Sequence, residues 1–237
     1  MKAIVLAGGE GTRLRPLTYT TPKPLIPVQG KTLTEQNLDI LKKAGVTEVV
    51  LGISYMADKI KDYFQNHPFP GIKIDYIVEE KPMGTAGPLL ILKRMGYLYD
   101  QDFIVINGDN LFALDLKKWV DFHKKNSAGV TIALSVVEDV TPYGVARMDG
   151  DKIVEFVEKP KPEEAPSNLI NSGYYIFSPE VFNYIDDSKD FIMLEKDVFP
   201  AMAKTGRLYG FRDEGQWFDT GTPERYESVK KNWRGLN

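Results

Sequence analysis

Unbroken apolar segments alternate with helix-like segments through the first half of this chain of 237 residues. A strand that is covered on both faces reads as such an unbroken apolar run. Parallel neighbours also need a long crossover between them, and a helix usually forms it. The pattern therefore predicts an α/β fold in which helices cover both faces of a mostly parallel sheet. The expected strands cover residues 2–6, 49–53, 72–78 and 103–106, and the expected helices cover residues 31–44, 57–64, 86–95 and 116–125.

The second half of the chain has shorter strand-like segments separated by turn residues, and it indicates a mixed α/β arrangement. The expected strands there cover residues 130–137, 144–148, 153–157 and 169–177, and the expected helices cover residues 195–204 and 224–232.

The composition of the chain narrows the classes of protein to which it can belong. A formal net charge of −3 argues against a general nucleic-acid or membrane-surface binder, whose basic stripes would raise the charge. No cysteine is present and the only histidines are His67 and His123, which excludes disulfides, thiolate metal sites and histidine-rich metal centres. No apolar run approaches the ~18 residues of a membrane span, and no cleavable signal is evident. We therefore expect a soluble, cytoplasmic protein.

A glycine-rich loop follows the first expected strand. Residues 8–11 include three glycines, which let backbone N–H groups approach an anion with no Cβ in the way. Arg13 and Lys23 add cations nearby. A tight strand-to-helix turn is the plainer interpretation, and the loop is neither a Walker A loop nor a dinucleotide fingerprint, because Leu14 stands where the third glycine should be. The loop and its cations favour a site for the phosphates of a nucleotide.

Two aspartates stand at the ends of expected strands. Asp109 comes shortly after the strand at 103–106, and Asp219 follows a short aromatic segment. Ligands of open α/β sheets bind outside the carboxyl ends of the strands, and Mg²⁺ prefers one or two carboxylates plus phosphate oxygens. Asp109 alone is also explained by an Asn-Gly-Asp turn. Together the two aspartates favour a Mg²⁺ ion that bridges a nucleotide and a second phosphate.

Glu158 and Lys159 end the strand expected at 153–157. The carboxylate can accept hydrogen bonds from sugar hydroxyls, and the lysine offers a compact cation to a phosphate. A solvated ion pair at an exposed strand end is the alternative interpretation.

Taken in order, the motifs of this chain resemble those of the nucleotidylyltransferases that make nucleoside-diphosphate sugars. The resemblance spans residues 1 to about 230. It is carried by Gly8-Gly9-Glu10-Gly11-Thr12-Arg13-Leu14, Pro22-Lys23-Pro24, Gly84-Thr85-Ala86-Gly87-Pro88, Gly108-Asp109, Tyr143-Gly144-Val145, Glu158-Lys159-Pro160, Asn171-Ser172-Gly173 and Trp217-Phe218-Asp219-Thr220-Gly221.

The resemblance implies a Rossmann-like three-layer sandwich of the glycosyltransferase-A type, with a mostly parallel mixed central sheet and without the left-handed β-helix that many relatives carry. It also implies a single nucleotidyltransferase domain over residues 1–237. Residues 1–125 would then form the nucleotide-binding half, and residues 126–237 the sugar-phosphate-binding half.

The resemblance further implies a role for each matching residue. A nucleoside triphosphate is expected on Leu6, Ala7, Gly8, Gly9, Gly11, Thr12, Arg13, Lys23, Glu79, Pro82, Gly84, Thr85 and Asp109. A sugar 1-phosphate is expected on Asn110, Tyr143, Gly144, Glu158, Lys159, Asn171 and Asp219. The expected catalytic residues are Arg13, Lys23, Asp109, Lys159 and Asp219, and the expected Mg²⁺ ligands are Asp109 and Asp219.

Glu79 bears on the choice of nucleobase. Relatives that take UTP or dTTP usually carry a glutamine at this place, five residues before Gly84. A carboxylate accepts two hydrogen bonds, which matches N1–H and the amine of guanine, whereas the carbonyls of uracil would be repelled. A solvated strand end is the alternative interpretation of Glu79. The stretch 79–88 also resembles mannose-1-phosphate guanylyltransferases more than thymidylyltransferases, so GTP and mannose 1-phosphate are favoured, with glucose and heptose phosphates as alternatives.

The expected reaction needs no general base, because the second pKa of a sugar phosphate lies near ~6 and the group is already anionic at neutral pH. The main alternative is a uridylyl-, thymidylyl- or cytidylyltransferase, including one that acts on phosphocholine. A nucleotide-sugar sensor without activity is an alternative of another class, although the catalytic residues are all present. A nicotinamide-dependent dehydrogenase would need an acidic residue after the second strand, and residues 53–55 supply none. A homo-oligomer is compatible with the sequence.

Overall fold

The computed structural model describes residues 1–97 and 99–236. The chain divides into two compact units, each assembled from segments that are far apart in the sequence. Unit 1 consists of Met1–Lys81, Ile106–Leu114 and Gly215–Asn237, and unit 2 consists of Pro82–Val105 and Asp115–Glu214. The assignment of nucleotide binding to residues 1–125 and of sugar-phosphate binding to residues 126–237 stays a prediction.

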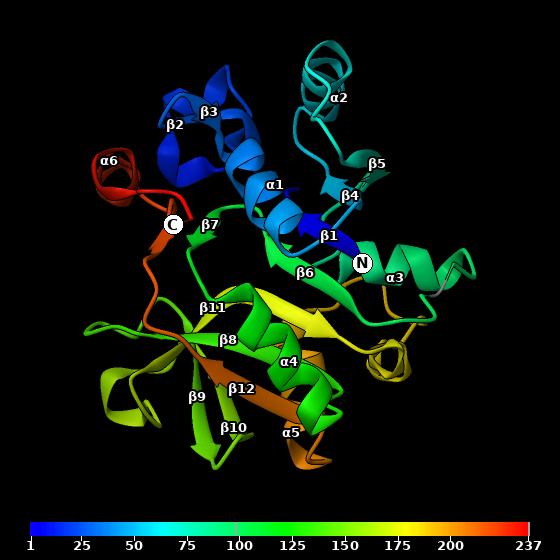
Figure 1. Cartoon of the computed structure of the whole chain (residues 1–237), viewed down its shortest axis with the longest axis vertical. Helices are drawn as coiled ribbons and strands as arrows, with labels where there is room; N and C mark the ends of the chain where they lie inside the picture. The colour runs from blue at the N-terminus through cyan, green and yellow to red at the C-terminus, as the bar shows by residue number, and fades with distance from the viewer. Residues whose placement is uncertain (98, 237) are drawn as a thin grey trace. The chain divides into compact units, whose positions relative to one another are not determined.

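Unit 1 contains a parallel sheet in which the strands lie in the order β5-β4-β1 (Figure 1). Residues 2–6 pair with residues 48–52, and residues 48–53 pair with residues 73–78, all in parallel register. The strands are β1 (Lys2–Leu6), β4 (Glu48–Ile53) and β5 (Lys73–Val78), and the helices between them are α1 (Leu33–Lys43) and α2 (Ala57–Asn66). The alternation of apolar runs and helices therefore predicted this part of the fold correctly.

Smaller elements complete unit 1 and shape its loops. Three short 3₁₀ helices follow β1, and two small antiparallel pairs, β2 with β3 and β7 with β13, lie outside the main sheet. These elements are η1 (Thr12–Leu14), η2 (Leu17–Tyr19), η3 (Lys23–Leu25), β2 (Pro27–Val28), β3 (Lys31–Thr32), β7 (Asn110–Phe112), β13 (Trp217–Asp219) and helix α6 (Pro223–Asn232). Strand β6 (Phe103–Asn107) carries the chain from unit 2 into unit 1.

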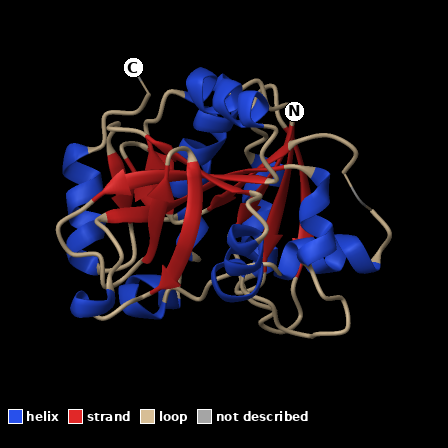
Figure 2. Ribbon diagram, turned by 90° about the horizontal axis from the view of Figure 1, so that it is seen from below, coloured by secondary structure: helices blue, strands red, loops and turns tan. Residues whose placement is uncertain are grey.

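Unit 2 contains a mixed sheet in the order β11-β8-β12-β10-β9. Figure 2 draws the strands of the chain in red and its helices in blue. Among the strand pairs described in this sheet, β8 and β12 are parallel, whereas β12–β10, β10–β9 and β11–β8 are antiparallel. The strands are β8 (Val130–Val136), β9 (Gly144–Asp149), β10 (Lys152–Glu158), β11 (Leu169–Phe177) and β12 (Leu208–Arg212). The helices are α3 (Gly87–Arg94), α4 (Leu116–Asn126), the π-helix η6 (Leu194–Val198), α5 (Phe199–Lys204) and the 3₁₀ helices η4 (Pro162–Glu164) and η5 (Pro179–Tyr184).

The chain is thus α/β with a mixed sheet. Parallel pairing prevails in unit 1 and antiparallel pairing in unit 2, because short turns such as Asp149–Asp151 can join only antiparallel neighbours. Among residues 1–97 and 99–236, no helix has the length and apolarity needed to cross a membrane.

Two predicted helices begin later than expected, each for a local reason. The helix expected from residue 31 begins at Leu33, because Lys31–Thr32 pairs as β3 and Thr32 caps the helix in a reciprocal arrangement with Glu35. The helix expected from residue 195 opens as a π-helix and becomes α-helical only at Phe199. Pro200 lacks an N–H group for the regular ladder, which is consistent with the wider turn before it.

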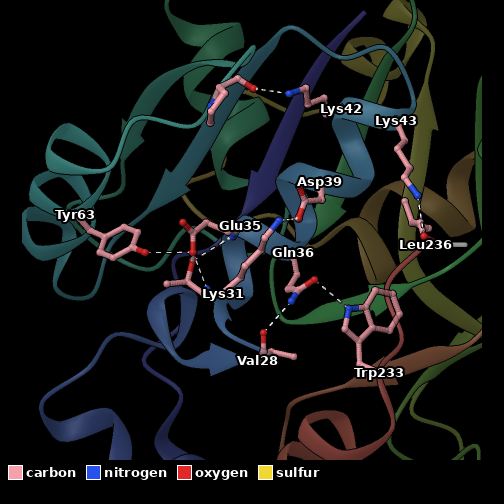
Figure 3. Close-up of polar contacts among 12 residues, drawn as sticks. Val28, Lys31, Glu35, Gln36, Asp39, Lys42, Lys43, Tyr63, Trp233 and Leu236 are labelled. Atoms are coloured by element: carbon pink, nitrogen blue, oxygen red, sulfur yellow. Dashed lines mark hydrogen bonds and ion pairs between the residues drawn. The ribbon is translucent and has the colours of Figure 1, made fainter.

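The C-terminal segment of unit 1 is fastened to α1 through a buried tryptophan (Figure 3). The indole N–H of Trp233 donates to Gln36 Oε1 (3.1 Å), and Gln36 Nε2 donates to the carbonyl of Val28 (2.8 Å). Lys43 reaches the carbonyl of Leu236 at 2.7 Å. The bonds made by Trp233 and Leu236 join residues 197 and 193 positions apart and connect the segment after α6 to α1.

Candidate active site

The glycine loop of unit 1 extends directly from β1. The N–H of Ala7 still donates to Gly52 O (2.8 Å), so the loop leaves the sheet only after residue 7. Gly11 has φ +62°, and a Cβ there would lie 3.0 Å from Thr18 and 3.3 Å from Lys23. Thr18 Oγ1 donates to Gly11 O at 2.8 Å. Glycine is therefore favoured at position 11 by both conformation and space, and the loop folds back against the segment that carries Lys23.

Lys23 and Asp109 form an ion pair beside this loop. The Lys23 side chain is 10% exposed, and its Nζ lies 2.7 Å from Asp109 Oδ2. Gly108 sets the position of Asp109, because its N–H donates to Leu6 O (2.9 Å) and a Cβ on Gly108 would lie 3.0 Å from the same oxygen. Asp109 is thus held next to the start of the glycine loop, as the sequence predicted.

The charge state of Asp109 follows from its neighbours. Loss of hydration acts to raise the pKa of this carboxyl, but attraction to Lys23, the hydrogen bond from Lys23 and the more distant Arg13 outweigh it. The pKa of Asp109 therefore lies below its ordinary value of 3.8, and the group is ionised at neutral pH.

Asp219 is brought beside this group by the pairing of two short strands. β13 pairs with β7 in antiparallel register, which sets Asp219 opposite Asn110. The backbone N–H and the hydroxyl of Thr220 both donate to the carbonyl of Asp109, at 3.0 and 2.9 Å. The two aspartates therefore leave neighbouring strand ends of unit 1, although 110 residues separate them in the sequence.

The carboxylate of Asp219 is nearly buried and already has partners. Its Oδ1 accepts the N–H of Gly221 at 2.6 Å, and its Oδ2 lies 2.9 Å from Arg225 Nη1. A Cβ on Gly221 would lie 2.8 Å from Asp219 Oδ1 and 3.1 Å from Arg13 Nη2, so the Arg13 guanidinium approaches the same point. No group of three or more acidic, histidine or cysteine side chains with metal-binding geometry exists among the described residues. Two carboxylates are the protein contribution that Mg²⁺ commonly uses with phosphate oxygens.

Glu79 follows β5 and reaches the glycine loop. Its N–H donates to Ile53 O (2.9 Å), and its carbonyl accepts the hydroxyl of Ser54 (2.9 Å), which fixes the backbone. Its Oε1 would lie 3.3 Å from a Cβ on Gly8. The side chain therefore lies over the loop and does not simply end a strand in solvent.

In unit 2, the predicted residues Pro82, Gly84 and Thr85 lie in a turn that packs against the backbone of Ile192. Gly84 has φ +83°, and a Cβ there would lie 2.2 Å from the carbonyl oxygen of Ile192. The N–H of Ile192 donates to Met83 O at 2.9 Å. The close approach of two backbones excludes every residue but glycine at position 84.

The buried side chain of Glu195 forms a hydrogen bond with the same turn. It is 6% exposed, and its Oε2 accepts the hydroxyl of Thr85 at 2.5 Å, while Thr85 Oγ1 accepts the N–H of Leu194 at 2.8 Å. Loss of hydration raises the pKa of Glu195 and nearby Glu158 raises it further, against the opposing effects of Thr85 and Lys159. Glu195 thus lies within electrostatic range of the two residues predicted to bind a sugar phosphate.

Glu158 and Lys159 lie at the end of β10, opposite Gly144 of β9. A Cβ on Gly144 would lie 2.4 Å from the Phe156 ring and 3.0 Å from Glu158 Oε2, so glycine makes room for this carboxylate. Lys159 has φ +50°, its N–H donates to Tyr143 O (3.0 Å), and its Nζ lies 3.4 Å from Glu158 Oε1. The Lys159 side chain is 63% exposed, whereas that of Glu158 is 11% exposed.

Asn171 stands at an irregularity of β11. The register with β8 shifts between Asn171 and Tyr175, and Gly173 has φ +80°. The Asn171 amide donates to Tyr175 OH (2.9 Å) and accepts the N–H of Gly173 (2.9 Å). The side chain thus supports the bulge, and its predicted contact with a sugar stays a prediction.

Comparison with known proteins places this geometry in a family. The family profile described as "Nucleotidyl transferase" matches residues 2–234. The chain belongs to the nucleotidyl transferase family. Mannose-1-phosphate guanyltransferase beta-A of Xenopus laevis is 41% identical over 95% of this chain and 62% of its own length. Mannose-1-phosphate guanylyltransferase of Mycobacterium tuberculosis is 38% identical over 94% of this chain and 62% of its own length. The chain therefore spans less than two thirds of these curated relatives.

Solved structures agree with this family assignment. A putative glucose-1-phosphate thymidylyltransferase from Bacillus anthracis has a TM-score of 0.89 and 27% identity, and the match covers 100% of this chain and 96% of that one. HddC from Yersinia pseudotuberculosis complexed with GMP-PN has a TM-score of 0.80 and 31% identity, with 98% and 99% covered. The mixed α/β fold of this nucleotidyl transferase is therefore that of sugar-phosphate nucleotidyltransferases.

Sequence reasoning did not single out two charged residues of this nucleotidyl transferase. Arg225 stands in the first turn of α6, where it reads as ordinary helix surface. Glu195 lies in a segment expected to start a helix, and an acidic residue in a first turn needs no other explanation. Neither residue gave a local signal, because each is defined by a partner that only the fold supplies.

Proposed function

We propose that this chain transfers a nucleotidyl group from a nucleoside triphosphate to a sugar 1-phosphate, with GTP and mannose 1-phosphate as the favoured substrates. The observation that carries the proposal is the Lys23–Asp109 pair beside the glycine loop, with Asp219 at the neighbouring strand end. Two polyanions must approach each other in this reaction, so cations and a divalent metal supply most of the catalysis. The relatives named mannose-1-phosphate guanyltransferase support the choice of sugar and base.

In unit 1, the glycine loop and Arg13 would hold the triphosphate, and Lys23 would approach its α-phosphate. The position of Gly11 against the Lys23 segment supports this arrangement, since it ties the loop to the cation. Glu79 would accept hydrogen bonds from guanine, and its reach over Gly8 supports a place beside the nucleotide.

Asp109 and Asp219 fit a divalent cation by the chemistry of their donor atoms. Asp109 is held ionised by the cations around it, and the β7–β13 pairing brings the two residues to neighbouring strand ends. Mg²⁺ bound there would neutralise phosphate oxygens and polarise the α-phosphate.

In unit 2, Glu158 and Lys159 would bind the sugar hydroxyls and the sugar phosphate. Glu158 is nearly buried, whereas the Lys159 side chain is largely exposed, so that a phosphate can reach its ammonium. At this strand end, the carbonyl of Tyr143 accepts the N–H of Lys159, and Gly144 lies opposite Glu158. Asn171 lies at the bulge of β11, which also pairs with β9.

In the reaction, a phosphate oxygen of the sugar 1-phosphate forms the new bond to the α-phosphorus, and the bond from that phosphorus to pyrophosphate breaks. The attacking oxygen is already ionised at neutral pH, so no protein group has to remove a proton. Arg13, Lys23 and Lys159 neutralise charge on the two reactants and hold them for in-line attack.

Release of pyrophosphate tests the proposal across GTP, UTP, dTTP and CTP, each with mannose, glucose and heptose 1-phosphates. The highest kcat/KM is expected for GTP with mannose 1-phosphate. Turnover with other nucleotides but not GTP would reject the guanine assignment, while the transferase assignment would stand. Binding of GDP-mannose without turnover of any pair would favour a sensor.

Substitution of Glu79 by Gln tests the base assignment. The variant is expected to lower kcat/KM for GTP relative to UTP, because the amide N–H₂ group replaces one acceptor of guanine donors. Glu80→Gln is the matched control, since Glu80 is the exposed neighbour of Glu79 and carries the same charge. An unchanged GTP-to-UTP ratio in Glu79→Gln would reject a contact between Glu79 and the base.

A further inference from the structure

Each aspartate of the proposed metal site already has a basic partner. Lys23 Nζ lies 2.7 Å from Asp109 Oδ2, and Arg225 Nη1 lies 2.9 Å from Asp219 Oδ2. The Asp219 side chain is 9% exposed and that of Arg225 is 33% exposed, so the second pair is partly shielded from water. The Coulomb attraction within such a pair is stronger than that within a fully exposed pair.

The helix that carries Arg225 does not require this residue. Arg225 lies in the first turn of α6, where the positive end of the helix dipole disfavours a cation. Thr222 already caps the helix, because its hydroxyl accepts the N–H of Arg225 at 3.4 Å. The guanidinium turns back to Asp219, six residues earlier. The position of Arg225 is therefore explained by the carboxylate and not by the helix.

The charges around the two aspartates favour a polyanion over a free cation. Arg13, Lys23 and Arg225 stand near Asp109 and Asp219, so positive charges outnumber negative ones in this cluster. A divalent cation that arrives alone meets net repulsion and must also displace Arg225 from Asp219 Oδ2. A triphosphate instead adds several negative charges and reverses the balance.

We propose that Arg225 is a positioning residue that occupies Asp219 until a nucleoside triphosphate is bound, so that the divalent cation binds together with the nucleotide and not alone. This inference rests on the proposed function, because it takes Asp219 as a ligand of the metal. It assigns a role to the guanidinium of Arg225, which turns back from the helix start to Asp219.

Binding of Mn²⁺ to the intact chain tests the inference, with electron paramagnetic resonance or calorimetry as the readout. The wild type is expected to bind Mn²⁺ weakly alone and much more tightly with GTP. Arg225→Gln is expected to bind Mn²⁺ alone about tenfold more tightly, as one unit charge near a partly shielded ion would cause. The stimulation by GTP should shrink accordingly.

Two further arginine variants serve as controls. Arg225→Lys keeps the charge and should resemble the wild type. Arg147→Gln removes an arginine–glutamate pair of 2.8 Å from unit 2 and should leave Mn²⁺ binding unchanged. Circular dichroism verifies that each variant is folded. An Arg225→Gln protein that binds Mn²⁺ no more tightly than the wild type overturns the inference.

Asp219→Asn separates this failure from failure of the proposed metal site. If Asp219→Asn weakens Mn²⁺ binding in the presence of GTP while Arg225→Gln has no effect, the metal site stands and the role of Arg225 is rejected. If Asp219→Asn and Asp109→Asn both bind Mn²⁺ with GTP as the wild type does, the metal site itself is rejected, and the inference falls with it.

Discussion

Lys23 shows how one residue can serve both the folded chain and the proposed chemistry. Its ammonium is nearly buried and held by Asp109 at 2.7 Å, so it is placed before any substrate binds. A buried cation without its carboxylate would be costly, and a carboxylate without the lysine would lose the effect that lowers its pKa. The two residues therefore depend on each other.

Replacement of Lys23 by Met tests this role at the residue scale. Met has a similar length without the charge, so kcat for pyrophosphate release should fall by about 10²–10³, as loss of one preorganised electrostatic group commonly causes. Lys118→Met is the control, because Lys118 is 78% exposed and forms a surface ion pair with Asp115. A Lys23→Met enzyme within twofold of the wild type would contradict the proposed contact with the α-phosphate.

The buried carboxyl of Glu195 should make the free energy of unfolding depend on pH. Its folded pKa is raised above 4.5, so ionisation costs more in the folded state than in the unfolded state. The wild type therefore loses stability from this group as the pH rises through 4.5 toward the folded pKa. Glu195→Gln keeps an acceptor for Thr85 but does not titrate. Its free energy of unfolding, relative to the wild type, should increase as the pH rises from 4 to 8.

Urea unfolding at several pH values measures this difference. Glu163→Gln, on an exposed 3₁₀ helix, controls for the loss of one acidic side chain anywhere on the surface. A difference between Glu195→Gln and the wild type that is independent of pH would show that burial does not perturb Glu195.

At the scale of elements, the Gly84 turn illustrates how a backbone contact defines a loop. Gly84→Ala would suffer both the positive φ of +83° and a Cβ 2.2 Å from Ile192 O. Gly150→Ala is the matched control, since φ is +56° and nothing lies within 4 Å of the new Cβ. The control should cost about 1–2 kcal/mol from conformation alone. Gly84→Ala should cost a further ~1–3 kcal/mol from crowding. Equal free energies of unfolding for Gly84→Ala and Gly150→Ala would contradict the close contact between Gly84 and Ile192.

Local patterns predicted most elements but not the contacts between distant ones. The apolar run 103–106 predicted a strand, and its four side chains are buried in β6. The helix expected over residues 224–232 forms as α6, which Thr222 caps. The bond between Thr85 and Glu195 joins residues 110 positions apart. No periodicity encodes such a pair, and the candidate site residues were predicted from motifs at strand ends and from the family resemblance.

The sequence predicted a mixed sheet but not which strands of unit 2 pair antiparallel, for a related reason. Strand periodicity reports which faces are covered, and it does not state which neighbour a strand chooses. β8 is buried along almost its whole length, as parallel β1 of unit 1 is at its three central residues, yet it pairs antiparallel with β11 and parallel with β12. Direction depends on the connections, so a mixed sheet requires the full path of the chain.

At the scale of the whole molecule, unit 1 draws its parts from the beginning, the middle and the end of the chain. Its site residues do the same, since Lys23, Asp109 and Asp219 each come from a different segment. Trp233 joins the last segment to the first, with 2% exposure and the bond to Gln36. Stability of the candidate site thus depends on the C-terminal segment.

Hydrogen exchange on Trp233→Ala tests this dependence. The substitution removes a large buried side chain, which typically costs about 3–5 kcal/mol. Because the segments share one core, exchange should accelerate in α1 and β7 as well as in α6. Trp119→Ala is the counterpart in unit 2, where Trp119 is fully buried, and its effect should appear in α4 and β8. If Trp233→Ala accelerated exchange only within residues 215–236, the C-terminal segment would unfold independently of the rest of unit 1. The segments that carry Lys23, Asp109 and Asp219 would then not form one cooperative unit.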